Sequence, residues 1–289
     1  MSFEFHSELS EDYLSVFKSE KYSDVIIKVG KESKPKEFQA HSFVLRARSK
    51  FFEEEIEKRI NNLSRNKIIL FIHEDFDLEA FKYILEYLYG GSFDLELKDI
   101  GLILNMLIIS DFLNLTNLIN VIQKYLVEKR KRHLNKQFSI VHQICSKYQS
   151  LVELQTYCDK TAQLNPGTIF EADDFINLDK DLLIFILENK KLRLNELQKW
   201  DYIIKWGIAQ TSSLPLPSDS PSSPSPSTYN TSLWSKSNFR DLSVTLKQII
   251  GLIDCKKIYS KDFNNKIRPF KKIFEKNYYE ELLTYHLLK

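Results

Sequence analysis

The spacing of hydrophobic residues changes along the first half of the chain, and each spacing predicts a different kind of element. Residues 23–29 and 66–72 are short runs rich in Ile and Val, which is typical of buried β-strands. Residues 37–40 follow a polar, turn-like stretch, so they are expected to pair with 23–29 as a hairpin. Elsewhere between positions 42 and 132 the apolar residues recur at helical spacing. Strands gathered apart from a run of helices indicate an α+β domain.

The helix with the clearest end signals covers residues 76–91. Asp77 suits its N-cap position, and Gly90 or Gly91 supplies the left-handed residue that ends many helices. Two more helices are expected at about 97–112 and 115–132. The first of these is apolar nearly all round, which predicts that it is buried.

A short amphipathic helix is predicted at residues 10–18, with Ser10 as its N-cap. Its apolar side chains form one stripe, and Leu9 and Leu14 could also pack together as a hydrophobic staple around the cap. The stripe consists of Leu9, Tyr13, Val16 and Phe17. A helix of this length cannot bury such a stripe by itself. It must therefore pack against the body of this chain or against a second chain.

From about residue 134 onward the pattern is helical, which predicts an all-α domain after the α+β domain. The exception is residues 211–232, a stretch rich in Ser and Pro that can sustain neither a helix nor a strand ladder. We expect it to be a disordered insertion between two helices. Its Ser-Pro steps at Ser220, Ser223 and Ser225 are candidate phosphorylation sites, although short Ser/Pro tracts also match such patterns by chance.

Composition narrows the class of protein further. Apolar residues make up 43% and charged residues 28% of the 289 positions, which is typical of a globular, soluble chain. The net charge of +2 gives no electrostatic footprint for nucleic acid or a membrane surface. No apolar run is long enough to span a bilayer, and the N-terminus lacks the apolar core of a signal peptide. Three unevenly spaced cysteines suggest reduced thiols, so an intracellular location, cytoplasmic and/or nuclear, is expected. The basic run 129–136 fits either a nuclear localisation signal or a solvated helix end.

No arrangement of residues predicts catalysis. The sequence lacks nucleophile-elbow, zinc-protease, Walker and Rossmann motifs. His142 and Cys145 stand three residues apart, with Cys158 further on, but structural zinc sites use closely spaced ligand pairs. We therefore expect no enzyme activity, no cofactor and no metal. His41 lies where a strand pattern gives way to a helix pattern, and it could be a base, a metal ligand or a structural pivot.

Three blocks, "YSDVIIKV", "FQAHSFVLRARSKFF" and "FKYILEYLYGG", resemble the core of a BTB/POZ domain. The matching residues are Ser23, Asp24 and Val25; Phe38, Ala40, His41, Ser49 and Phe52; and Phe81, Leu85, Tyr87, Tyr89 and Gly91. This resemblance implies a BTB/POZ domain at 21–130, preceded by a dimerisation helix region at 1–20. It also implies that His41 is a structural residue at a strand–helix junction. Ser42 occupies a position that is often Lys or Arg in transcriptional-repressor members, where it pairs with the residue matching Asp24.

Residues 133–289 more loosely resemble a BACK domain, the helical domain that often follows BTB. The matching stretches are "FINLDKDLLIFIL" and "NELQKWDYIIKWG", which contains Trp200 and Trp206. The Ser/Pro-rich stretch would then be an insertion within this domain.

The combined resemblance implies a non-enzymatic, homodimeric adaptor that recruits a cullin-3 ubiquitin ligase to an unknown substrate protein. The dimer interface would be formed by Leu9, Tyr13, Leu14, Val16 and Phe17. Many cullin-binding members carry an apolar-x-Glu signature that aligns here with Ile60, Asn61 and Asn62, so the apolar anchor is present and the carboxylate is not. The alternative is a dimeric BTB scaffold, cytoskeletal or transcription-associated, without a ligase partner.

Overall fold

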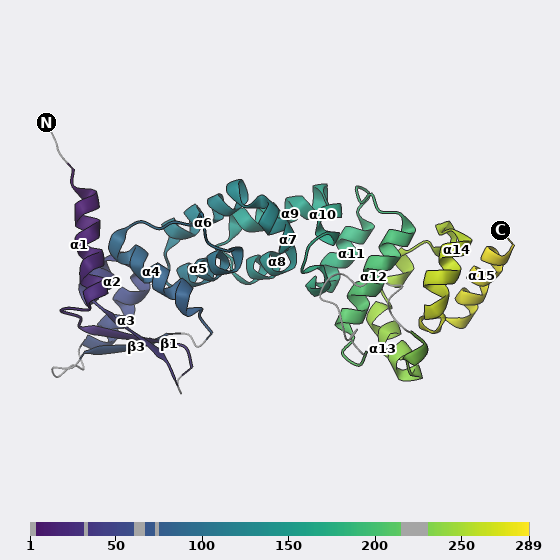
Figure 1. The fold of residues 1–289 in the computed structure, drawn as a ribbon, viewed down its shortest axis with the longest axis horizontal. Helices are drawn as coiled ribbons and strands as arrows, with labels where there is room; N and C mark the ends of the chain where they lie inside the picture. The colour runs from purple at the N-terminus through teal and green to yellow at the C-terminus, as the bar shows by residue number, and fades with distance from the viewer. Residues whose placement is uncertain (1–3, 32–33, 61–66, 73–74, 215–230, 289) are drawn as a thin grey trace. The chain divides into compact units, whose positions relative to one another are not determined.

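The computed structural model describes residues 4–31, 34–60, 67–72, 75–214 and 231–288 (Figure 1). The chain divides into two compact units. The first consists of Met1–Lys131 together with Cys145–Leu154, and the second of Arg132–Ile144 together with Gln155–Lys289.

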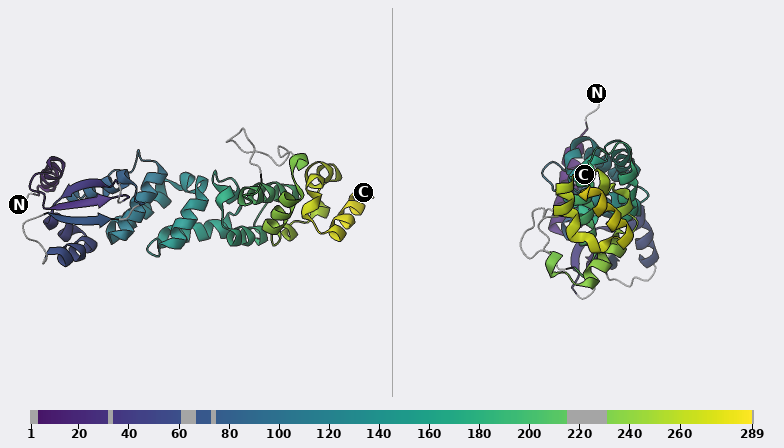
Figure 2. Two further views of the ribbon diagram at one scale, coloured as in Figure 1. Left: turned by 90° about the horizontal axis from the view of Figure 1, so that it is seen from below. Right: turned by 90° about the vertical axis from the view of Figure 1, so that its right-hand side faces the viewer.

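The first unit contains the sheet, which the sequence pattern predicted. Its strands are β1 (Val25–Val29), β2 (Lys36–Ala40) and β3 (Ile68–Ile72), in the order β2-β1-β3 (Figure 2). Strand β1 pairs antiparallel with β2 and parallel with β3. Alternate residues of β1 and β3 are buried, so one face of the sheet forms part of the core and the other is open to solvent.

Helices complete the first unit, which is therefore an α+β fold as predicted. They are α1 (His6–Ser19), α2 (Ser42–Arg48), α3 (Lys50–Ile60), α4 (Leu78–Gly90), α5 (Ile100–Phe112) and α6 (Thr116–Lys129). The prediction that Ser10 caps the first helix is wrong. The helix begins a turn earlier, after Phe5, whose carbonyl accepts from Leu9 N at 3.1 Å. No Pro or Gly interrupts the residues before Ser10, so the helix extends toward the N-terminus.

The end signals of α4 and α5 act as the sequence indicates. The Asp77 side chain accepts a hydrogen bond from Ala80 N at 2.8 Å, and Asp99 does the same for Leu102 N at 3.1 Å. Gly91, with φ of 68°, is the left-handed residue after α4. These caps fix where α4 begins and ends, and with it the position of Tyr89 in its last turn.

The regular secondary structure in the described residues of the second unit is all helical, which also agrees with the sequence pattern. The helices after α6 are α7 (Lys131–Lys136), α8 (Phe138–Lys147), α9 (Val152–Leu164), α10 (Gly167–Phe170), α11 (Lys180–Glu188), α12 (Glu196–Gln210), α13 (Lys236–Leu246), α14 (Ser260–Asp262) and α15 (Lys276–Leu287). The described residues among them also form the short helical turns η1 (Phe175–Asn177), η3 (Thr231–Leu233), η4 (Ile250–Leu252), η5 (Cys255–Lys257), η6 (Phe263–Ile267) and η7 (Arg268–Ile273).

Two tryptophans of α12 anchor the second unit. Trp200 is fully buried and packs against Phe270 and Phe274, with ring centroids 5.9 and 5.8 Å away. The indole Nε1 of Trp206 donates to the Leu178 carbonyl at 2.8 Å. Buried aromatic rings of this size contribute much of the apolar area of a small core.

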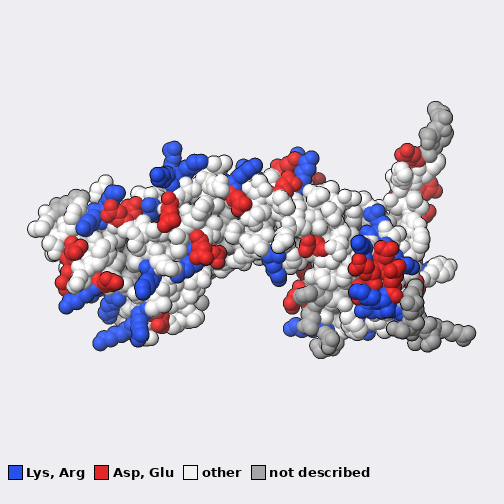
Figure 3. Space-filling view, turned by 180° about the vertical axis from the view of Figure 1, so that it is seen from behind, with Lys and Arg blue, Asp and Glu red and all other residues white. Residues whose placement is uncertain are grey.

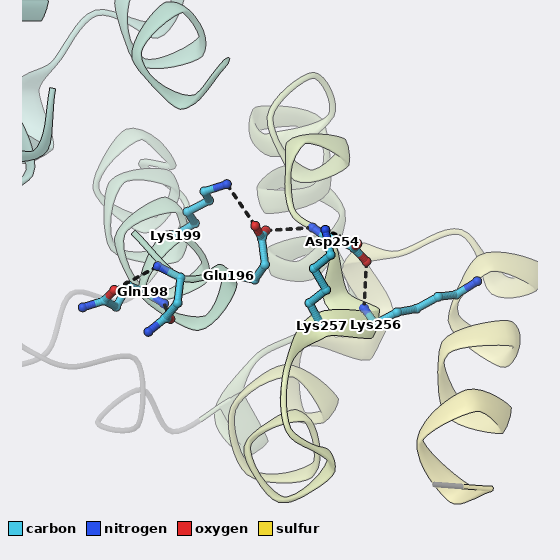
Figure 4. Close-up of polar contacts among 7 residues, drawn as sticks. Glu196, Gln198, Lys199, Asp254, Lys256 and Lys257 are labelled. Atoms are coloured by element: carbon cyan, nitrogen blue, oxygen red, sulfur yellow. Dashed lines mark hydrogen bonds and ion pairs between the residues drawn. The ribbon is translucent and has the colours of Figure 1, made fainter. Parts of the chain in front are cut away.

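Polar contacts join the start of α12 to η5 (Figure 4). One carboxylate oxygen of Glu196 accepts from Lys199 Nζ at 3.0 Å, and the other accepts from Asp254 N at 2.9 Å. The Asp254 side chain in turn accepts from Lys256 N at 3.2 Å. These bonds satisfy backbone groups at the start of η5, so we assign them a structural role.

Candidate functional site

His41 is a structural junction in the first unit. Its Nε2 lies 2.7 Å from the Lys21 carbonyl oxygen, and its Nδ1 lies 2.8 Å from the Tyr89 hydroxyl. A carbonyl can only accept, so the network assigns the proton to Nε2 and leaves Nδ1 to accept from Tyr89. His41 thereby ties the segment before β1 to the last turn of α4, which is the role that the family resemblance implies.

The Tyr89 hydroxyl has two partners on the same residue. It also accepts from the backbone N–H of His41 at 2.8 Å. Burial raises the pKa of this hydroxyl well above its ordinary value; the bond from His41 opposes that rise, and nearby Asp24 adds to it. Tyr89 therefore stays neutral and serves as a fixed hydrogen-bonding group, with no feature of a proton-transfer residue.

Asp24 holds the start of α2. Its carboxylate accepts from Ser42 N at 2.7 Å and from Ser42 Oγ at 2.5 Å. His41 is the N-cap residue of α2 and caps it with no side-chain bond, so Asp24 supplies the missing acceptor from the neighbouring segment. Ser42 thus hydrogen-bonds to Asp24, whereas a Lys or Arg at this position would form an ion pair with it.

The remaining family-motif residues also lie in the framework. Ser49 is buried and its Oγ donates to the Leu113 carbonyl at 2.8 Å, which links the start of α3 to the end of α5. Phe52 is fully buried in the core. Gly91 ends α4 in the left-handed conformation described above. Ser49 and Phe52 are therefore buried framework residues of this unit.

The first helix packs on α4 of its own unit. Phe17 is 8% exposed and stacks on Tyr89 with ring centroids 4.7 Å apart. Leu14 lies over Gly90, where a Cβ would stand 2.7 Å from Leu14 Cδ1. Of the five residues expected at a dimer interface, Phe17 and Leu14 thus pack at least in part against α4 of their own chain.

The other side of α1 remains open. Leu9 is 54% exposed and Val16 is 36% exposed, while Tyr13 is half-buried. Phe43 of α2, which fits the helical apolar pattern together with Val44, is 73% exposed. We call Leu9, Tyr13, Val16 and Phe43 the first-helix face.

A cavity of about 300 Å³ opens at this face. Its lining includes Leu9, Tyr13, Phe43, Arg48 and Gly91, from α1, α2 and the end of α4. The cavity can therefore receive a side chain from a second protein that covers the first-helix face. Apolar walls with one cation at the rim suit an apolar or aromatic residue.

A second cavity, of about 390 Å³, lies within the first unit. It is lined by α5 residues, by the segment before α4, and by Lys147 and Tyr148. Phe76 and Phe112 form its aromatic wall with ring centroids 5.1 Å apart. Three carboxylates also line it, those of Asp75, Asp77 and Asp111. An apolar segment that carries a basic residue would match this lining.

Several predicted site residues fall outside what the structure describes. Ile60 is the last residue of α3, but its side chain is not described, and Asn62 lies beyond the described residues. The candidate phosphorylation sites Ser220, Ser223 and Ser225 lie outside them as well. The helix that leads to Ile60 is charged on its surface, and Glu55 bonds Lys58 Nζ at 2.7 Å and Arg59 Nη1 at 2.5 Å.

The soft-ligand residues considered from the sequence are not gathered into a metal site. Within the described ranges no group of three or more His, Cys, Asp or Glu side chains could hold a metal ion. Cys145 and Cys158 are buried, as is Cys255, and burial raises the pKa of the Cys255 thiol to about 12. Such a thiol is protonated at neutral pH and a poor nucleophile.

Charge and hydropathy set limits on what the surface can bind. Lys and Arg side chains are interspersed with Asp and Glu on the face of the molecule in Figure 3. No described helix is both long and apolar enough to cross a membrane. The first-helix face and the two cavities have apolar linings of the kind that bind a protein side chain.

Comparison with known proteins finds two family models along the chain. The BTB/POZ domain model matches residues 13–130, and the BACK model (BTB And C-terminal Kelch) matches residues 139–214. BTB/POZ domain-containing protein 9 of Drosophila melanogaster is 25% identical over 202 residues, which are 68% of this chain and 26% of that protein. The chain thus spans about a quarter of that relative's length. The BTB domain of zebrafish PATZ1 matches 45% of this chain and 99% of its own, with 20% identity and a TM-score of 0.36.

Proposed function

We propose that this chain, a BTB/POZ domain followed by a BACK domain, acts as a homodimeric, non-enzymatic adaptor that recruits a cullin-3 ubiquitin ligase. BTB and BACK domains are protein-interaction domains, so the class of function is an interaction adaptor. Our proposal adds that the chain forms a homodimer, that it binds cullin-3, and that it serves a ubiquitin ligase.

The first-helix face is the observation that carries the dimer. Leu9 and Phe43 are large apolar side chains with more than half of their surface exposed, and both line the same cavity. Burying a side chain of this size stabilises by about 1.5–3 kcal/mol before the ordering costs of association. A two-fold contact buries the same face on both copies and doubles that gain.

The support for cullin binding comes from the end of α3 and from the second cavity. Ile60 follows a charged helix surface and occupies the anchor position of the family signature. In the same unit, the cavity lined by Phe76, Phe112 and three aspartates offers a binding site for an extended segment. Asn62 in place of the family glutamate favours the alternative, a dimeric scaffold without a ligase partner.

A titration with the purified N-terminal domain of cullin-3 separates these two functions. We expect wild type to bind and Ile60→Asp to lose at least about 2 kcal/mol of binding free energy, as at a central hot spot. Asn62→Glu restores the family carboxylate and should strengthen binding. Val121→Asp is the matched control, because Val121 is exposed on α6 of the same unit and lines neither cavity.

Circular dichroism of each variant verifies that the fold is retained. Absence of binding by both wild type and Asn62→Glu would refute the cullin adaptor and leave the scaffold.

A further inference from the structure

The two edges of the sheet differ in how they are protected. Strand β2, at one edge, begins after Pro35 and carries Lys36 and Glu37, both exposed. Proline and charged residues are the usual means by which an edge strand avoids pairing with another chain. Strand β3, at the opposite edge, consists of five consecutive apolar residues, Ile68–Ile72, with neither safeguard.

The backbone groups at the open edge of β3 can be assigned from its pairing. Ile68 N donates to the Asp24 carbonyl at 2.9 Å, so Ile68, Leu70 and Ile72 direct their N–H and C=O groups toward β1. Ile69 and Phe71 therefore direct theirs away from the sheet. Among the described residues nothing bonds these outward groups.

The side chains at this edge are apolar and exposed. Phe71 is 62% exposed and Ile69 is 42% exposed, both on the open face of the sheet. Lys28 of β1 lies beside Phe71, with Nζ 5.6 Å from the ring centroid, and its Nζ also pairs with Glu37 at 2.8 Å. The ion pair of this face thus joins β1 to β2, and its exposed apolar side chains lie at the β3 edge.

We propose that the open edge of β3 is a second self-association surface, on which β3 of another copy pairs antiparallel about a two-fold axis at Leu70. In this register Ile69 of each copy lies opposite Phe71 of the other, and each such pair exchanges two backbone hydrogen bonds. The two three-stranded sheets would join into one.

The sequence of β3 favours this register over its neighbours. A two-fold axis at Ile69 would place Phe71 opposite Lys67, and one at Phe71 would place Ile69 opposite position 73, beyond the strand. The axis at Leu70 instead pairs both exposed apolar side chains with apolar partners, which is the favourable cross-strand arrangement.

This surface is separate from the first-helix face, since none of its residues lies on α1 or α2. A chain with both surfaces forms assemblies larger than a dimer, whose average mass rises with concentration. Phe71→Glu should reduce them to dimers, because pairing would set its carboxylate opposite the apolar Ile69 of the other copy, whereas in the free chain it is open to solvent beside Lys28. Val121→Glu, the same change at an exposed site on α6, should leave the assemblies unchanged.

Light scattering over a concentration series measures the average mass of the assemblies, which depends on both the first-helix face and the β3 edge. If wild type and Phe71→Glu are both dimers, the β3 proposal is wrong and the first-helix dimer stands. If wild type is a dimer and Phe71→Glu a monomer, β3 pairing stands and the first-helix dimer fails.

Disulfide trapping tests the register directly. Mixed Ile69→Cys and Phe71→Cys proteins should cross-link under mild oxidation, because hydrogen-bonded partners have Cα atoms about 5.5 Å apart, within the range of a disulfide. Ile69→Cys alone, or Phe71→Cys alone, should not cross-link, because the same position in the two copies would be a diagonal neighbour about 7–8 Å away. The native cysteines are all buried, which keeps the background low. Equal cross-linking of the single variants, or none in the mixture, would overturn the proposed register.

Discussion

The side chain of Leu14 in α1 lies directly over Gly90 in the last turn of α4, so that a Cβ at position 90 would stand 2.7 Å from Leu14 Cδ1 and 3.0 Å from Leu14 Cγ. This close approach lets α1 dock on its own unit and holds Leu9 and Tyr13 at the surface. The first-helix face therefore depends on Gly90, although Gly90 is not one of its residues.

Enlarging Gly90 should displace α1. Gly90→Val should cost about 1–3 kcal/mol of unfolding free energy, the usual effect of overpacking, because its side chain occupies the space of Leu14. Adding Leu14→Ala should recover part of that loss, whereas Leu14→Ala alone should destabilise. Chemical denaturation of the four proteins in this cycle measures the coupling. Purely additive effects would show that the two residues do not share the space.

Removing the Tyr89 hydroxyl should weaken the strand–helix junction. Tyr89→Phe leaves the backbone N–H and Nδ1 of His41 without their shared partner, which should cost about 1–3 kcal/mol of unfolding free energy. Tyr87→Phe on the same helix is the matched control, because no hydrogen bond of the Tyr87 hydroxyl is found among the described residues. Equal losses of unfolding free energy in Tyr89→Phe and Tyr87→Phe would contradict a stabilising role for the hydrogen bonds of the Tyr89 hydroxyl.

His142 should make the second unit sensitive to acid. Burial lowers the pKa of His142 from its ordinary value of 6.5, although Asp159 and Asp179 act in the opposite direction. The unfolded chain therefore binds more protons than the folded one just below pH 6.5, and the unfolding free energy falls as the pH is lowered through that range.

Denaturant titrations at a series of pH values measure this effect. His142→Gln should flatten the dependence between neutral pH and about pH 5, since glutamine does not titrate. His133→Gln, at an exposed position on α7, serves as the control. An unchanged slope in His142→Gln would show that other groups cause the acid sensitivity.

Periodicity sufficed to predict the elements but not the faces that they present. The run of Ile and Val at 23–29 and the caps at Asp77 and Gly91 are local signals, so strand and helix positions followed from them. Whether Phe17 faces its own unit or a partner depends on α4, more than 60 residues away, as the printed sequence shows. The orientation of Phe17 is therefore set by tertiary contacts, which the apolar stripe of the first helix cannot reveal by itself.

Gly90 and Phe43 illustrate the same limit. The sequence offers Gly90 and Gly91 equally as helix stops, yet only Gly91 takes the left-handed conformation, and Gly90 serves close packing. Phe43 fits a helical apolar pattern with Val44, but it is exposed while Val44 is buried. A helix as short as α2 presents too few positions for its pattern to distinguish a buried face from an interface.

The oligomeric state of Phe71→Glu tests most directly whether the chain dimerises through the first-helix face. This substitution removes the proposed β3 contact, so the first-helix face is the proposed self-contact that remains. Light scattering at micromolar concentration should give twice the chain mass for Phe71→Glu. Adding Leu9→Asp and Phe43→Asp, both at exposed positions, should give the chain mass with an unchanged circular dichroism spectrum. A monomer before these two changes, or a dimer after them, would contradict a homodimeric adaptor assembled through the first helix.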